Sequence, residues 1–385
     1  MAGKTITVFT DGDSSLLSTW SNVPCLMTRS FEKDWGIKVN RVNMAPNPAL
    51  EYLYNTTVGR TVRVLCDRET SYDFKRSFLH KIICKHRMKQ AVKDYPDTDM
   101  FLSLSYSWNP KRYTGRPCMM FCDWSYGYYF EKFRQRTPDW FERYELKRED
   151  RYLSDCDYVI SLFPDSAEWL RTHGIIQAVY LGNVINAVED PCEQDVPAKC
   201  NSNSIVFIGR EQYIDSACEM IKALELLNDD DTGWEAHVIG VSREELSKAL
   251  GREQLPVFVK CYGYLSKDKE EDRKTYYELL RTAFCCVNTT PKWAAMSSVI
   301  EEMYYYNPII TLPNDNFVQM FGEEIAFGKY VSANTAQEIR RTISELKHMD
   351  KQQYENICYN AHDMVKDYTW KKYTAEMLRM AGILE

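Results

Sequence analysis

The sequence lacks long apolar runs, has few histidines and carries no surplus of positive charge. No stretch of about 18 consecutive apolar residues occurs, so no segment is predicted to cross a membrane as a helix. The net charge is −7 over 385 residues. That balance argues against a nucleic-acid partner, because such proteins carry clustered cations. The opening MAGKTITVFT lacks the apolar core of a signal peptide and continues directly into a strand-like run.

Motifs for metal binding are also missing. The sequence contains no HExxH and no CxxC pair, and its six histidines are scattered. Asp-x-Asp triplets occur at 11–13, 97–99 and 155–157, where turns are expected, so we interpret them as turn residues. Several of the thirteen cysteines lie in apolar runs, as Cys285 and Cys286 do, which is typical of buried, reduced thiols. We therefore expect a cytoplasmic protein that uses no metal.

Strands alternate with helices along the whole chain, which predicts an α/β protein built from parallel, right-handed βαβ units. A polar, proline-containing segment at 187–203 interrupts this alternation and is predicted to be a linker. We expect an N-terminal Rossmann-like domain at 1–186, a second one at 204–366, and a final helix within 367–385 that packs back on the first. The predicted strands are 5–10, 38–44, 100–105, 117–123, 158–162, 179–181, 204–209, 235–240, 257–259, 283–287 and 309–312.

The loops that follow the strands are the expected ligand-binding positions, because open parallel sheets bind ligands beyond the carboxyl ends of their strands. Four such loops, at 11–15, 123–128, 210–215 and 289–293, are expected to converge on a cleft between the two domains.

The segment TPKWAAMSSVIEEMYYYNPIITL at 290–312 reads as a loop, a helix and a strand. A helix is predicted over about 296–306, and Asn307-Pro308 ends it because proline cannot continue the hydrogen-bond ladder. Glu301 and Glu302 lie about 100° apart around this helix. One can be solvated while the other points at a ligand, and the alternative is that both form an ordinary solvated pair.

The order of these motifs resembles the group 1, family 4-like retaining glycosyltransferases, which have the GT-B fold. FIGR at 207–210, YGYL at 262–265 and VNTTP at 287–291 occur in the family's order, followed by a helix with a Glu and a Pro before a β-branched strand. Aligning that Pro with Pro308 places the family's second Glu on Glu301. PCMMFCDWSYGYY and DYVISLFPDSAEWL look like the end of the family's acceptor domain. The chain departs from the family at Trp293, where a Glu is usual, and at Asp215, where a Lys is usual.

The resemblance implies a donor site in the second domain. Arg210 is expected to bind the diphosphate, Glu301 to hold the ribose hydroxyls through its two acceptor oxygens, and Lys292 to substitute for the missing lysine. An exposed arginine at the end of a strand is the alternative reading of Arg210. The predicted donor-binding residues are Gly209, Arg210, Tyr264, Thr289, Thr290, Lys292 and Glu301.

The acceptor side is predicted around Asp123, which follows an apolar strand and has Trp124 and Tyr126 beside it. Aromatic rings pack on sugar faces, and a carboxylate binds hydroxyls or takes a proton. A turn-capping aspartate is the alternative. Gly12 and Asp13, after the first strand, are further acceptor-binding candidates, against an ordinary strand-to-helix turn. Asp123 and Glu301 are the predicted catalytic residues.

These inferences predict a glycosyltransferase that moves a sugar from a nucleotide-sugar donor to an acceptor hydroxyl with retention of anomeric configuration. The acceptor is a glycan, a lipid-linked molecule or a small molecule, and peripheral membrane contact stays open. No cofactor is expected beyond the nucleotide-sugar co-substrate. One rival hypothesis is a sugar-nucleotide epimerase of the same fold. The other is a binding or scaffold protein without turnover, and Trp293 and Asp215 favour this second one.

Overall fold

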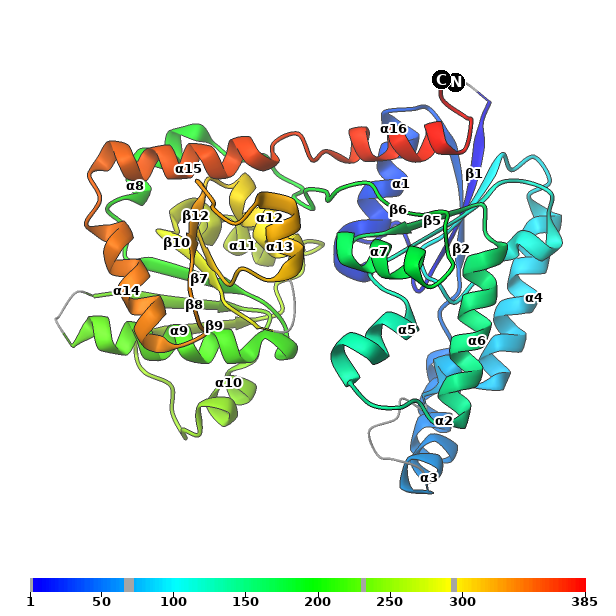
Figure 1. The fold of residues 1–385 in the computed structure, drawn as a ribbon, viewed down its shortest axis with the longest axis horizontal. Helices are drawn as coiled ribbons and strands as arrows, with labels where there is room; N and C mark the ends of the chain where they lie inside the picture. Colours follow the sequence, from blue (N-terminus) through cyan, green and yellow to red (C-terminus); the bar gives the residue numbers. More distant parts are fainter. Residues whose placement is uncertain (1–2, 66–72, 230–232, 292–295) are drawn as a thin grey trace. The chain divides into compact units, whose positions relative to one another are not determined.

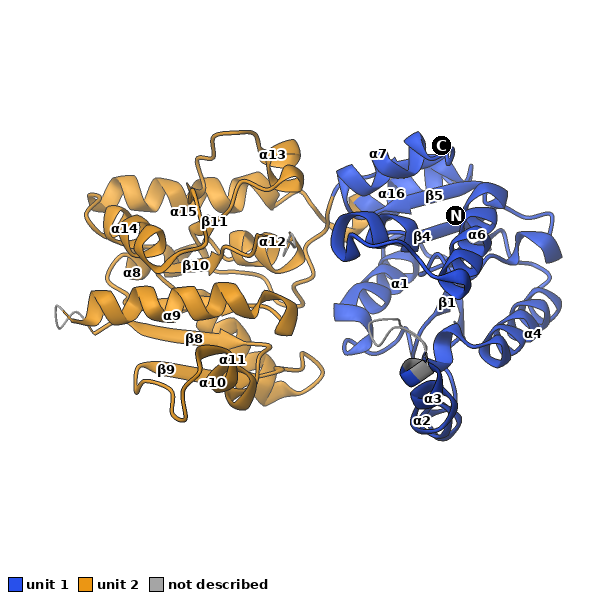
Figure 2. Ribbon diagram, turned by 60° about the horizontal axis from the view of Figure 1, so that its bottom comes forward, with its two compact units in different colours: residues 1–182, 373–385 blue, residues 183–372 orange. Residues whose placement is uncertain are grey.

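The computed structural model describes residues 3–65, 73–229, 233–291 and 296–385 (Figure 1). The chain divides into two compact units, drawn in different colours in Figure 2. Unit 1 comprises residues 1–182 and 373–385, and unit 2 comprises residues 183–372. Each unit contains a six-stranded parallel sheet with flanking helices, which confirms the predicted α/β class.

The strands of unit 1 are ordered β2-β1-β3-β4-β5-β6. The strands of its core are buried on both faces, as the burial of the whole of β1 illustrates, because helices cover both sides of a parallel sheet. The order reverses between β1 and β3, and open sheets bind ligands at such a point. The strands are β1 (Thr5–Thr10), β2 (Lys38–Asn43), β3 (Met100–Ser103), β4 (Cys118–Cys122), β5 (Tyr158–Ser161) and β6 (Ala178–Tyr180).

The helices of unit 1 begin at side-chain caps that the sequence supplies. Ser77 accepts a hydrogen bond from the backbone N–H of His80 at the start of α4, and Asp139 forms a capping box with Glu142 at the start of α6. The helices are α1 (Val23–Lys33), α2 (Pro48–Thr56), α3 (Val58–Leu65), α4 (Phe78–Asp94), α5 (Tyr126–Tyr129), α6 (Trp140–Asp155) and α7 (Pro164–Thr172), with short turns η1 (Thr19–Asn22), η2 (Phe74–Arg76), η3 (Pro110–Tyr113) and η4 (Phe130–Arg134).

The end of the chain belongs to unit 1. Within α16 (Trp370–Met380), the Thr374 hydroxyl lies 2.9 Å from the Ser30 hydroxyl and accepts a hydrogen bond from the Trp35 indole N–H at 2.9 Å. The ring of Tyr373 also meets that of Phe121 on β4 edge-to-face, at 6.0 Å. These contacts attach the C-terminal segment to the first sheet of the chain.

The strands of unit 2 are ordered β12-β11-β10-β7-β8-β9, with the reversal between β7 and β10. The predicted strand at 257–259 is wrong by several residues, because Val257 is fully exposed in the turn that precedes β9. The sequence also gave no signal for the short β12. The strands are β7 (Ser204–Ile208), β8 (Glu235–Ile239), β9 (Val259–Gly263), β10 (Cys285–Asn288), β11 (Ile309–Thr311) and β12 (Gly328–Tyr330).

Part of the segment predicted as a linker folds within unit 2. It contains the turn η5 (Glu193–Asp195) and α8, and Val196 is fully buried in the apolar core of this unit. The helices of unit 2 are α8 (Val196–Lys199), α9 (Ile214–Asn228), α10 (Arg243–Leu250), α11 (Glu270–Thr282), α12 (Met296–Tyr304), α13 (Asp315–Phe321), α14 (Ala336–Lys347) and α15 (Lys351–Val365). Among the helices in the described ranges, none has both the length and the apolar content needed to cross a bilayer.

Candidate functional site

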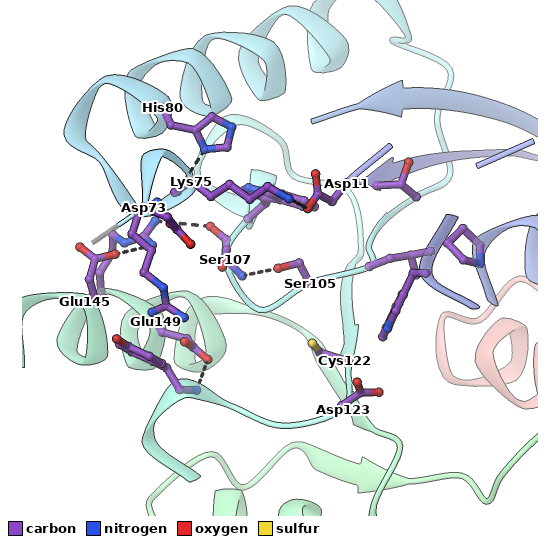
Figure 3. Close-up of a pocket in the computed structure, with 18 of the residues that line it drawn as sticks. Asp11, Asp73, Lys75, His80, Ser105, Ser107, Cys122, Asp123, Glu145 and Glu149 are labelled. Atoms are coloured by element: carbon purple, nitrogen blue, oxygen red, sulfur yellow. Dashed lines mark hydrogen bonds and ion pairs between the residues drawn. The ribbon is translucent and has the colours of Figure 1, made fainter. Parts of the chain in front are cut away.

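A cavity of about 470 Å³ opens at the carboxyl edge of the sheet in unit 1 (Figure 3). Its floor is formed by the residues that end β1, β3 and β4, at the reversal of strand order. Its walls come from η1, η2, α4 and α6. The strand-end residues are Thr10, Asp11, Leu104, Ser105, Cys122 and Asp123, and the polar wall residues include His80 and the acidic and basic residues Asp73, Lys75, Arg76, Glu145, Arg148 and Glu149.

Asp123 lies at the end of β4 with its carboxylate in the cavity lining (Figure 3). Burial raises the pKa of this carboxyl to about 6, and a hydrogen bond from the Trp20 side chain opposes the shift. Trp20, Ser21 and Asn22 have φ values of 36°, 53° and 74°, a left-handed run that costs energy in residues other than glycine. The strained turn therefore holds an indole against the acid.

A second acid with a raised pKa comes from α6. Glu149 accepts a hydrogen bond from the backbone N–H of Tyr126 at 2.9 Å. Burial raises the pKa of Glu149 to about 7, against the opposing effects of that hydrogen bond and of Arg76 and Arg148. The cavity thus holds two carboxyl groups that change charge near neutral pH, as acid–base residues of enzymes do.

Three basic side chains, Lys75, Arg76 and Arg148, form one wall of the cavity, and each has a different partner. Lys75 forms an ion pair with Asp11 at 2.6 Å, and Arg148 forms one with Glu145 at 2.8 Å. The guanidinium of Arg76 instead stacks over the ring of Tyr126, 3.7 Å from its centroid. Sequence reasoning missed this wall. One signal was available, because Glu145, Arg148 and Glu149 have the i, i+3, i+4 spacing that places side chains on one helical face.

The predicted acceptor residues are distributed between the cavity and its surroundings. Asp123 and Tyr126 lie together in its lining, whereas Gly12, Asp13 and Trp124 are not among the described lining residues. Asp13 closes its own turn, since its carboxylate accepts from the backbone N–H and the hydroxyl of Ser15, which lowers its pKa. The Trp124 ring stacks on Phe163 at 5.4 Å.

In unit 2, several predicted donor residues lie at the reversal of strand order. Gly209 and Arg210 follow β7, and the Arg210 guanidinium is 5.9 Å from the centroid of the Tyr264 ring, just beyond β9. A side chain at Gly209 would come within 2.7 Å of the Phe207 ring, so only glycine fits there. Arg210 itself is exposed at the end of its strand.

The threonines after β10 at the same reversal are buried and engaged. Thr289 donates to the side-chain oxygen of Asn334 at 2.6 Å, and Thr290 donates to that of Asn288 at 3.0 Å. These side chains fix the loop from within, so a ligand there would meet backbone groups first. Lys292, predicted as a phosphate partner, and Trp293 lie outside the described residues.

The predicted orientation of Glu301 and Glu302 is wrong in one respect, because neither is solvated. Glu301 is 3% exposed and forms an ion pair with Lys267, and its oxygens also accept from the hydroxyls of Tyr276 at 3.2 Å and Tyr277 at 3.3 Å. The role of Glu301 at a ribose stays a prediction. It requires the carboxylate to leave its present hydrogen-bond partners and bind the ribose hydroxyls instead. Glu301 is buried because α11 and the loop after β9 cover the helix face that carries it.

Glu302 is also enclosed, with 1% exposure. Its Oε2 atom has no hydrogen-bond partner among the described residues. Burial, and then the nearby charge of Glu301, raise its pKa well above the ordinary value. Burial of Glu302 therefore favours its protonated form.

One acid of each Asp-x-Asp triplet forms an ion pair with a lysine that is distant in the sequence. Asp11 pairs with Lys75, Asp99 with Lys4 at 3.0 Å, and Asp157 with Lys111 at 2.7 Å. In the part of the chain that the structure describes, no three His, Cys, Asp or Glu side chains are grouped as a metal site.

Comparison with known proteins places the fold. No protein-family model matches the sequence, and no curated protein does. Similar solved structures include the sucrose-phosphate synthase of Thermosynechococcus elongatus (TM-score 0.69, 13% identity, 98% of both chains) and HepE of Anabaena in complex with UDP and glucose (0.60, 13%, 98% of this chain and 99% of that one).

TarM is also similar, with a TM-score of 0.59 and 14% identity over 78% of this chain, which spans 58% of the TarM chain. These neighbours are GT-B glycosyltransferases, so the chain has the GT-B fold. The predicted resemblance to that fold is confirmed, and at these identities the likeness extends to the fold alone.

Proposed function

We propose that this protein is a glycosyltransferase that moves a sugar from a nucleoside-diphosphate sugar to a hydroxyl of an acceptor held in the cavity of unit 1. The observation that carries the proposal is Asp123, a carboxylate with a raised pKa that follows β4 and lines that cavity. The fold supports it, because the similar structures are glycosyltransferases and one of them contains UDP and glucose.

In the proposed reaction the acceptor hydroxyl attacks the anomeric carbon of the donor. The bond from that carbon to the diphosphate breaks, the new glycosidic bond forms, and the hydroxyl proton passes to Asp123. An acid with a pKa of about 6 is ionised at neutral pH and is a stronger base than an ordinary aspartate. The family resemblance implies retention of anomeric configuration, which requires the hydroxyl to attack on the face from which the diphosphate leaves, because attack from the opposite face would invert the anomeric centre.

The donor is proposed to bind at the carboxyl edge of the sheet in unit 2. Gly209 allows the backbone to approach a phosphate closely, and Arg210 offers a charge-assisted hydrogen bond to it. No metal takes part in this proposal, since Arg210 and the backbone N–H groups of the loops supply the stabilisation of the leaving diphosphate.

A binding or scaffold protein without turnover is the second candidate. It is favoured by Glu301, whose two oxygens are already engaged by Lys267 and two tyrosines inside unit 2. Asp215 in place of the expected lysine adds to it, because an anion there disfavours a diphosphate.

A two-stage experiment separates these functions. First, thermal shifts with UDP, GDP, ADP, CMP and their sugars identify the donor, since a ligand at 100 times its Kd stabilises by about 2.7 kcal/mol. Arg210→Ala should reduce the affinity roughly 10- to 100-fold, whereas the exposed control Arg243→Ala should not. Second, nucleoside diphosphate release is measured with sugar and glycolipid acceptors. Stabilisation without acceptor-dependent release favours the scaffold, and no response to any nucleotide contradicts both candidates.

A further inference from the structure

The outer face of α4 carries apolar side chains that the fold leaves uncovered. Phe78 is 72% exposed, and Leu79 and Ile82 are each 49% exposed, all in the first two turns of the helix. The inner face of the same helix is buried, as Cys84 and Met88 show. Helices of globular proteins usually turn their apolar side chains inward, so the exposed apolar side chains at the start of α4 are an exception.

The start of α6 extends this uncovered region. Trp140 is 70% exposed and Tyr144 is 51% exposed, one helical turn apart. The Lys81 amine of α4 lies 5.2 Å from the Tyr144 ring centroid and pairs with Glu145, so the two helices adjoin there. Figure 1 shows α4 and α6 side by side. We call Phe78, Leu79, Ile82, Trp140 and Tyr144 the apolar surface.

Exposed apolar side chains are concentrated in this part of unit 1. Of the fifteen large apolar side chains found exposed in the described residues, ten belong to α2, α3, α4 and α6. α2 adjoins the start of α4, because the Asn55 side chain accepts from the backbone N–H of Phe74 at 2.9 Å. Single exposed apolar residues are ordinary, but a gathering of them marks an interaction site.

Lysines continue the same helical stripe. Phe78, Ile82, Lys85, Lys89 and Lys93 follow one another at intervals of four, three, four and four residues, which aligns them on one face of α4. The three lysines are exposed. The exposed face thus passes from apolar to cationic along the helix.

Acidic side chains do not cancel this charge near the apolar surface. Glu142 and Glu145 are buried in ion pairs with Arg136 and with Lys81 and Arg148. Among the exposed acids of α4 and α6, Asp94, Asp150 and Asp155 lie toward the C-terminal ends of the helices. Arg143 and Lys147 of α6 are exposed and add positive charge.

We propose that the apolar surface and the lysine stripe of α4 dock unit 1 on an anionic lipid bilayer. Aromatic and aliphatic side chains of such a surface enter the headgroup region, where Trp and Tyr are favoured, while lysines attract lipid phosphates. The chain as a whole has a net charge of −7, so the expected attraction to anionic lipid comes from the local cluster of cations on this face. Because η2, α4 and α6 also line the cavity, docking holds the cavity beside the headgroups.

Vesicle sedimentation of the full chain tests the proposal. Vesicles of phosphatidylcholine alone are compared with vesicles that also contain phosphatidylglycerol, in the absence of donor and acceptor. The protein should bind the anionic vesicles, and the Phe78→Ser/Trp140→Ser double variant should bind them at least about tenfold more weakly, because binding scales with buried apolar area. Lys85→Glu/Lys89→Glu should bind more weakly and should lose the salt dependence of binding.

Ile176→Ser is the matched control, since Ile176 is 82% exposed in unit 1 but lies before β6. It should bind as the wild type does. The proposal is overturned if the wild type does not bind, if it binds neutral vesicles equally well, or if the double variant binds unchanged. It is also overturned if the double variant loses self-association and vesicles do not reduce self-association of the wild type, because the surface then belongs to a protein interface. None of these measurements depends on sugar transfer.

Discussion

The guanidinium of Arg76 lies over the ring of Tyr126, 3.7 Å from its centroid. This contact joins η2 to the start of α5, and the hydrogen bond from the Tyr126 backbone to Glu149 joins α5 to α6. Three segments far apart in the sequence therefore form one wall of the cavity. The wall places a cation and a titratable acid near Asp123, which is the basis of the first predictions.

Asp123→Asn should lower turnover about 100-fold or more while leaving nucleotide affinity unchanged. The amide preserves shape but takes no proton, and a positioned acid or base contributes roughly 10²–10⁴-fold. Single-turnover rates and nucleotide dissociation constants of variant and wild type measure this. Asp13→Asn is the control, since Asp13 closes its own turn. Wild-type turnover in the variant would return Asp123 to a structural role.

The pH profile of kcat/KM should rise with an apparent pKa of about 6. Burial raises the pKa of Asp123 to that value, so the carboxylate needed to accept a proton disappears as pH falls through it. The measurement is initial rate against pH from 5 to 8 at low donor concentration. Asp123→Asn should lack this acid limb, and an unchanged limb in the variant would assign it to another group.

Stability should fall as pH rises toward neutrality because of Glu149. Its pKa is raised from an ordinary 4.5 to about 7, so within that window the folded protein holds a proton that the unfolded chain has released. Raising pH therefore lowers the free energy of unfolding, and the loss is complete above about pH 7. Glu149→Gln should reduce this decline by roughly 1 to 3 kcal/mol. Denaturant unfolding from pH 4 to 8 measures it.

The exposed control Glu253→Gln should reproduce the wild-type decline. A decline that is equally steep in Glu149→Gln would show that the burial of Glu149 does not set it.

Glu301→Gln should destabilise unit 2 by about 3–5 kcal/mol, because it leaves the buried Lys267 without its counterion. Glu302→Gln should cost less than about 1 kcal/mol, since burial raises the pKa of Glu302 and an amide has the shape of the neutral carboxyl group. Thermal or urea unfolding compares them. Lys267→Met/Glu301→Leu should recover most of the loss. Equal stability of the two glutamine variants would contradict the ion pair.

Turnover should survive EDTA. One acid of each Asp-x-Asp triplet is paired with a lysine, and the proposed leaving-group stabilisation comes from Arg210 and backbone N–H groups. Rates before and after chelation, and after return of Mn²⁺ or Mg²⁺, provide the measurement. A strict metal requirement would remove the metal-free part of the proposal.

The sequence by itself determined the α/β class and most strand positions. Alternation of apolar strands with helices is local information, and the helix stop before Pro308 is read within a few residues. The same local reading placed Asp123 and Arg210 directly after strands. It failed for the bounds of β9 and for β12, neither of which carries a clear apolar run.

Only the tertiary structure decided which side chains meet. Helical periodicity separates Glu301 from Glu302 by angle, but it does not reveal that α11 and Lys267 cover one and that the core encloses the other. The Arg76 stack on Tyr126 joins residues fifty positions apart, and the Glu149 bond to Tyr126 joins α6 to the start of α5. Such pairings depend on the order of strands in the sheet, because that order sets which loops become neighbours.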